Sequence, residues 1–169
     1  AFAGLTYRGK VRLLIAGDGP DRRALQALAA ALGIADRVSF VGHVEEPHKV
    51  YPLMDIFAMS SDTEQMPNTL LQAMAASRPV ASVDIGDVRA ILPPENAALV
   101  APRGDEAGLA AAIDRLLADR GLRDALAAAN RRHVVAAYSK ERMYAAYGAL
   151  FDEAIATGRR GVRAAETAR

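Results

Sequence analysis

The chain has 169 residues and no cysteine, which excludes a disulfide scaffold, thiolate zinc sites and thiol catalysis. Its 21 Lys and Arg residues against 20 Asp and Glu residues leave a net charge of +1, and this balance argues against nucleic acid as the main partner. No apolar run approaches the roughly 18 residues of a membrane span, and no signal peptide opens the chain. We therefore expect a cytoplasmic protein.

Short apolar runs alternate with longer amphipathic stretches, which is typical of strands that alternate with helices. The predicted strands are 11–16, 38–41, 55–59, 80–83 and 98–101, and the predicted helices are 21–32, 67–76, 105–118, 122–137 and 140–155, with a helical turn or two within 45–53. This alternation predicts an α/β domain over residues 1–156, with a Rossmann-like doubly wound parallel sheet and C-terminal helices. The basic residues 157–169 lack periodicity and are predicted to form a disordered tail.

Two glycine-containing loops follow the first two predicted strands. They are Gly17-Asp18-Gly19-Pro20 and Gly42-His43-Val44. In open parallel sheets ligands bind beyond the carboxyl ends of the strands, and glycines let the backbone approach a flat ligand closely. Taken alone, each loop is equally consistent with a tight turn that binds no ligand. His43 is then an ordinary loop residue.

Residues 60–72 carry a stronger signal, because a strand runs into a polar loop and Pro67 then starts a helix. The first free amides of that helix belong to Asn68, Thr69 and Leu70. Unpaired N–H groups and the positive end of a helix dipole suit a phosphate group. The sequence therefore predicts an anion site at the start of this helix.

Polar side chains flank the same helix start. Asn68 and Gln72 lie four residues apart on one side of the helix, and Glu64 reaches the same place from the preceding loop. A carboxylate accepts hydrogen bonds from sugar hydroxyls well. The apolar residues expected to face the sheet are Leu70, Leu71 and Met74. A solvated loop and a solvent-facing helix flank explain the same pattern, and spacing alone does not choose between the two.

The order and spacing of these residues resemble a known family. The segment Asp55-(x5)-Ser61-(x2)-Glu64-(x2)-Pro67-Asn68-Thr69-Leu70-Leu71-Gln72-Ala73-Met74-Ala75, followed by Pro79-Val80, is similar to the C-terminal donor-binding domain of retaining glycosyltransferase family 4 (glycosyltransferases group 1, GT-B fold). Other stretches fit the same family, namely Leu14-Ile15-Ala16-Gly17-Asp18-Gly19-Pro20, Val38-Ser39-Phe40-Val41-Gly42, and Leu99-Val100 leading into Leu109. The likeness covers residues 1–155.

The resemblance implies a role for each matching residue. Glu64 falls on the first Glu of the family's Glu-x7-Glu signature, which contacts the donor sugar, and Gln72 falls on the second, which holds the ribose. The amides of Thr69 and Leu70 correspond to those that bind the distal phosphate. The loops that contain Gly17 and Gly42 flank the base. Because the helix start holds the phosphate, the resemblance implies no required metal and no cofactor beyond the nucleotide-diphosphate sugar substrate.

The implied activity of the full-length protein is transfer of a hexose-type sugar from a nucleotide-diphosphate donor to an acceptor, with retention at the anomeric carbon. The chain opens with Ala1-Phe2-Ala3 rather than Met, so we expect a piece that lacks an N-terminal domain with the acceptor site and is inactive alone. The family's first strand would lie between strands 11–16 and 55–59. We expect these two strands either to pair directly or to leave a defect filled by another chain.

Further partner expectations concern surfaces rather than the donor. The full-length protein is expected to make peripheral contact with the inner face of a membrane. The last helix carries an apolar stripe of Met143, Tyr144, Tyr147, Leu150, Phe151 and Ile155. We expect this stripe to pack in the core, with any part left exposed driving self-association.

Departures from the family pattern keep an alternative open. Gln72 replaces a Glu, Gln65 and Ser77 replace glycines, and Gly86-Asp87-Val88-Arg89-Ala90 stands where the family often has Gly-Gly-x-Pro-Glu. A non-catalytic module of the same fold, kept for binding or interaction, would show such changes. A second alternative is a response-regulator receiver domain, since Asp62 follows a strand. No Lys stands at the end of a later strand to support that reading.

Overall fold

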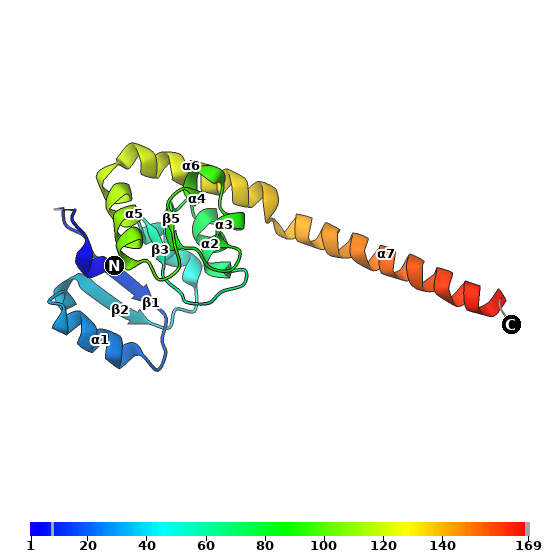
Figure 1. The fold of residues 1–169 in the computed structure, drawn as a ribbon, viewed down its shortest axis with the longest axis horizontal. Coiled ribbons are helices and arrows are strands. Elements are labelled where there is room, and N and C mark those ends of the chain that lie inside the picture. The colour runs from blue at the N-terminus through cyan, green and yellow to red at the C-terminus, as the bar shows by residue number, and fades with distance from the viewer. Residues whose placement is uncertain (8, 168–169) are drawn as a thin grey trace.

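A computed structural model describes the backbone of residues 1–7 and 9–167, and the side chains of these residues as far as Thr157. It shows an α/β body from which a long helix extends (Figure 1). The strands are β1 (Leu13–Ala16), β2 (Val38–Gly42), β3 (Phe57–Met59), β4 (Val80–Val83) and β5 (Val100–Ala101). The α-helices are α1 (Arg22–Ala31), α2 (Asn68–Ala75), α3 (Val88–Ile91), α4 (Pro94–Ala97), α5 (Glu106–Ala118), α6 (Arg120–Ala137) and α7 (Lys140–Thr167).

All strand pairs are parallel, as predicted, but the described strands form two sheets rather than one. β1 pairs with β2, and the second sheet has the order β3-β4-β5. Within the described residues no strand lies between β1 and β3 and no ladder joins them. The prediction that β1 and β3 pair directly is therefore wrong. The sheet is interrupted between these two strands.

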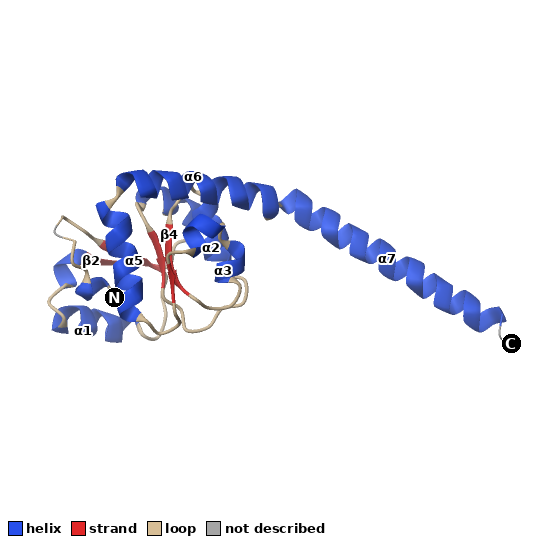
Figure 2. Ribbon diagram, turned by 45° about the horizontal axis from the view of Figure 1, so that its top comes forward, coloured by secondary structure: helices blue, strands red, loops and turns tan. Residues whose placement is uncertain are grey.

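The core lies around the second sheet. Helix α5 packs on one face of this sheet, and α2 and α3 lie on the other (Figure 2). All four residues of β4 are buried, which is typical of a central parallel strand covered on both faces. Leu70 and Met74 of α2 are fully buried and Leu71 is half-buried against the same cluster, so the predicted apolar face of this helix is confirmed.

The first sheet is covered less completely. Helix α1 buries only Ala29, while the side chains predicted to form its apolar face, such as Leu25, Leu28 and Leu32, are 43 to 53% exposed. The β1–β2 sheet has two strands and its residues are at most half-buried. A sheet this narrow offers too little apolar surface to bury a helix face.

Short helical segments fill the connections. The predicted helical turns within 45–53 are confirmed as two 3-10 turns, Pro47–Lys49 and Tyr51–Leu53. A 3-10 turn at Phe2–Gly4, another at Ala35–Arg37, and the four-residue helices α3 and α4 were not predicted, because segments this short carry no hydrophobic periodicity. A turn of residues 84–87 joins the end of β4 to the start of α3.

Helix α7 corrects two expectations. It leaves the body of the molecule (Figure 1), and its stripe from Met143 to Ile155 is 46 to 65% exposed, so the stripe does not join the core. The helix continues to Thr167 where a disordered tail was predicted from residue 157; Ala168 and Arg169 lie outside the described residues. Extending a formed helix costs little per residue, especially through alanine, whereas starting one is unfavourable. Within the described residues, no helix combines the length and apolar character needed to cross a membrane.

Candidate functional site

The start of α2 is the central feature of the candidate site. Pro67 has an extended backbone (φ −72°, ψ 111°), and the helix begins at the next residue, Asn68. The amides of Asn68 and Thr69 have no hydrogen-bond partner among the described residues, and both residues are exposed. The amide of Leu70 differs from the prediction, because it donates to the Pro67 carbonyl at 3.1 Å. The first turn closes on Pro67, so two free amides remain rather than three.

Glu64 lies in the loop that leads into α2. Its side chain is half-buried, and the Ser61 hydroxyl donates to its Oε1 at 3.0 Å. Its second carboxylate oxygen has no partner among the described residues. Glu64 is thus held at one oxygen and retains acceptor capacity for hydroxyl groups at the other.

Gln72 lies one turn after the helix start and is held by Tyr51. The Tyr51 hydroxyl donates to Gln72 Oε1 at 2.9 Å. Burial raises the pKa of Tyr51 above its usual 10.0, so the hydroxyl keeps its proton and acts as the donor. The Gln72 Nε2 group has no protein partner among the described residues, and the side chain presents N–H donors where a carboxylate would present only acceptors.

The two glycine loops predicted as site elements lie together. Gly17 N donates to Gly42 O at 2.7 Å, and both residues have positive φ values, 135° and 73°, that other residues rarely adopt. Arg22 braces the pair by donating to Phe40 O at 3.0 Å and to Asp18 Oδ2 at 3.5 Å. In the same loops Gly19 is exposed and its amide is held by Asp18 Oδ1 at 2.9 Å, while His43 is exposed and Val44 is half-buried.

The structure groups the predicted residues in two places. Glu64, Asn68, Thr69 and Gln72 surround the α2 start, whereas the glycine loops lie at the carboxyl ends of β1 and β2. In the described chain no hydrogen bond or ion pair joins these two places. Tyr51 lies at the start of α2 with Glu64 and Gln72, and the sequence did not predict it as a site residue. The one feature of the sequence that could have indicated it is an aromatic residue within the predicted helical turns of residues 45–53.

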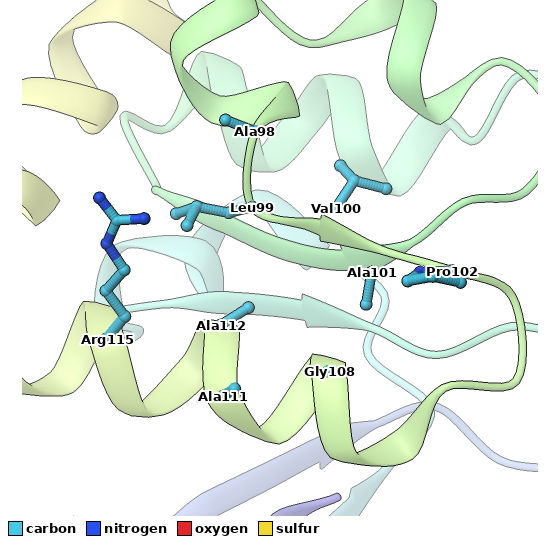
Figure 3. Close-up of a pocket in the computed structure, with 9 residues that line it drawn as sticks. All are labelled: Ala98, Leu99, Val100, Ala101, Pro102, Gly108, Ala111, Ala112 and Arg115. Atoms are coloured by element: carbon cyan, nitrogen blue, oxygen red, sulfur yellow. The ribbon is translucent and has the colours of Figure 1, made fainter.

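A hollow of about 240 Å³ lies elsewhere, between β5 and α5 (Figure 3). It is lined by Ala98, Leu99, Val100, Ala101, Pro102, Gly108, Ala111, Ala112 and Arg115. Arg115 is the one charged side chain among these nine residues, and none of them is a predicted site residue. A hollow with so few polar groups lacks the converging donors and acceptors of a specific ligand site.

Comparison with known proteins decides the family. The profile of the family Glycosyl transferases group 1 matches residues 1–119. The chain belongs to this family. The lipopolysaccharide core biosynthesis glycosyltransferase LpsD of Rhizobium meliloti is 33% identical over 159 residues, which are 92% of this chain and 46% of that protein. The chain thus spans less than half the length of this relative.

Solved structures confirm the C-terminal GT-B half-domain fold that the sequence predicts. Sucrose-phosphate synthase from Thermosynechococcus elongatus superposes with a TM-score of 0.77 and 27% identity, over 86% of this chain and 39% of that one. The Anabaena protein HepE, solved in complex with UDP, superposes with a TM-score of 0.81 and 16% identity, over 90% of this chain and 43% of that one. The receiver-domain alternative is therefore excluded.

Proposed function

We propose that this group 1 glycosyltransferase chain binds a nucleotide-diphosphate sugar, and that the intact protein transfers a hexose-type sugar from it with retention at the anomeric carbon. The observation that carries the proposal is the start of α2, where two exposed amides between Glu64 and Gln72 have no partner among the described residues. Such a helix start attracts a phosphate group through its free N–H groups and its dipole. The UDP bound to the related Anabaena structure supports a nucleotide ligand.

Each residue then has a distinct task. The free oxygen of Glu64 accepts hydrogen bonds from the donor sugar, and the amides of Asn68 and Thr69 bind the distal phosphate. Gln72, oriented by Tyr51, binds the ribose. The loops at Gly17 and Gly42 flank the base. We propose that the acceptor binds in a part of the intact protein outside this chain, which spans 46% of the length of its LpsD relative.

We propose that donor binding needs no metal ion, because the helix start itself supplies donors for the phosphate charge. Donor affinity and sugar transfer by the intact protein are expected to be unchanged after EDTA treatment. Loss of activity in EDTA that returns with added Mg²⁺ or Mn²⁺ would contradict this part of the proposal.

The decisive experiment is a calorimetric screen of the intact protein against UDP-, GDP-, ADP- and dTDP-sugars. We expect micromolar binding of at least one donor and its transfer to an acceptor. Gln72→Glu belongs in the same screen, because a carboxylate restores two charged acceptors for the ribose diol. We expect it to bind the same donor about fivefold more tightly, the effect of one charge-assisted hydrogen bond. No heat with any donor would contradict the proposal.

A non-catalytic binding module is the alternative function. It is favoured by one specific observation, the simultaneous presence of Gln65, Gln72 and Ala90 where the family pattern has glycine and glutamates. Under this alternative, neither the wild type nor Gln72→Glu releases heat with any donor in the screen. A donor that binds the wild type in the micromolar range excludes it.

A further inference from the structure

The turn between β4 and α3, residues 84–87, supports the loop that carries Glu64. Gly86 has a φ of +47°, and a Cβ atom there would lie 2.5 Å from the Glu64 carbonyl oxygen and in contact with the Gln65 carbonyl oxygen. The Asp87 amide donates to Gln65 O at 2.9 Å. The two segments are therefore in direct backbone contact, which no residue with a side chain at position 86 would permit.

Arg89, on the first turn of α3, ties this turn to its surroundings. Its Nε donates to Asp84 Oδ2 at 2.9 Å, its Nη1 to Ala97 O at 3.1 Å, and its Nη2 to Val100 O at 3.1 Å. A guanidinium is the side chain suited to this task, because its planar fork reaches several acceptors in fixed directions. The three bonds join the start of the turn to the end of α4 and the start of β5.

The fold of this region does not depend on Arg89 alone. Ile85, Val88 and Ile91 are at most 5% exposed and anchor the turn in the core, whereas the Arg89 side chain is 49% exposed. A variant at position 89 is therefore expected to fold. What it loses is the bonding that fixes the direction in which Gly86 and Asp87 face the Glu64 loop.

We infer that Arg89 is a positioning residue for Glu64, acting through the contact of Gly86 and Asp87 with the backbone of residues 64 and 65. The inference rests on the proposed function, in which Glu64 contacts the donor sugar. Among the described residues, Ser61 is the one hydrogen-bond partner of the Glu64 carboxylate. If the turn at residues 84–87 moves, the Glu64 backbone moves with it, and a single hydrogen bond from Ser61 is too weak to keep the carboxylate in place.

The test compares Arg89→Met and Arg89→Lys with a matched control, Arg123→Met, in the intact protein. Arg123 also donates to backbone carbonyls, those of Leu116 and Leu117, but among the described residues no hydrogen bond or ion pair links it to the Glu64 loop. One measurement is the NMR amide signals of Glu64 and Gln65. The other is transfer with UDP-glucose, GDP-glucose, ADP-glucose or dTDP-glucose, together with the affinity for the matching nucleoside diphosphate.

We expect Arg89→Met to shift the Glu64 and Gln65 signals and to lower kcat about tenfold or more, since small misplacements of reacting groups are costly. Its affinity for the nucleoside diphosphate, which lacks the sugar, is expected to stay within about twofold of wild type, because a lost sugar contact leaves phosphate contacts intact. Arg89→Lys is expected to recover part of kcat. Arg123→Met is expected to lose stability without either change.

Unchanged amide signals in Arg89→Met would overturn the inference even if the wild type transfers sugar. Equal losses of kcat in Arg89→Met and Arg123→Met would also overturn it, since they would reflect general destabilisation. If the wild type binds none of the nucleotides, the proposed function fails first and the role of Arg89 is overturned with it. Gly86→Ala provides a second variant, expected to shift the same signals further.

Discussion

The two ends of helix α2 differ in whether the protein itself satisfies their backbone hydrogen-bonding groups. At the first end the amides of Asn68 and Thr69 are exposed and have no partner among the described residues. At the other end the carbonyls are satisfied by the protein. Ser77 N donates to Met74 O and Arg78 N to Ala73 O, which together form a Schellman motif.

Two guanidinium groups complete the closure of the second end. Arg131 of α6 donates to Ala75 O, and Arg78 donates to Ala76 O at 2.9 Å and to Met54 O. Positive charges at a helix C-terminus also complement its dipole. The protein's own groups therefore satisfy the negative pole of α2, whereas the amides at its positive pole stay exposed, where we propose that the phosphate binds. Changes at the first end should therefore alter binding, and changes at the second should alter stability.

Asn68→Pro gives the largest expected effect. Proline removes one of the two free amides at the first helical position, where it is tolerated because Pro67 already has an extended backbone. The lost bond to a charged phosphate is worth about 1.5–3 kcal/mol, so nucleoside-diphosphate affinity should fall tenfold or more. Calorimetry measures this. Asn68→Ala is the control, since it keeps the amide; equal losses in both variants would assign the effect to the side chain.

Arg78→Met tests the other end of the helix. The carbonyls of Ala76 and Met54 lose a charged donor, and the free energy of unfolding should fall by about 2 kcal/mol. The affinity of the folded protein for a nucleoside diphosphate should not change. Urea denaturation and calorimetry check the two statements. Arg103→Met is the matched control, because Arg103 makes no hydrogen bond or ion pair among the described residues. A loss of binding in Arg78→Met would break the division between the two ends.

Tyr51→Phe tests whether the hydrogen bond from Tyr51 to Gln72 contributes to nucleotide binding at the start of α2. Without the hydroxyl, the Gln72 amide is no longer oriented, and nucleoside-diphosphate affinity should fall about fivefold, the effect of one hydrogen bond of about 1 kcal/mol. In a Gln72→Ala background the same change should have no effect on affinity. A double-mutant cycle gives the coupling energy. Additive effects of the two substitutions would show that Tyr51 does not act through Gln72.

Ser77→Gly gives the smallest expected change, and it is stabilising. Ser77 has a φ of 57°, a left-handed conformation that glycine adopts without strain. The substitution should raise the free energy of unfolding by about 0.5–1 kcal/mol and leave ligand binding unchanged. Urea denaturation measures the gain, with Ser77→Ala as the control that keeps a Cβ atom. A destabilised glycine variant would contradict the assignment of strain to this residue.

Local sequence patterns were sufficient for the elements that carry the site. Helix α2 was predicted to within one residue at each end, because Pro67 marks its start and Leu70 and Met74 mark its buried face. Strand β3 is shorter than predicted. Among the described strands it pairs only with β4, and residues 55 and 56 precede the paired segment. The tail was misjudged because helix propagation needs no apolar periodicity.

The finer features of the site depend on contacts between segments distant in sequence. The amide of Leu70 was expected to be free, but it donates a hydrogen bond to the Pro67 carbonyl. The Tyr51 to Gln72 bond spans 21 residues and the Arg89 to Val100 bond spans 11, and both exist only once the body has packed. Spacing rules describe neighbours on one helix and do not reach such pairs.

The most direct test of the account is a crystal structure of the intact protein with the nucleoside diphosphate of the donor identified in the screen. We predict that the distal phosphate lies within hydrogen-bond distance of the amides of Asn68 and Thr69, with the ribose beside Gln72. A diphosphate bound elsewhere, for example in the hollow between β5 and α5, with the start of α2 left to solvent, would contradict the account.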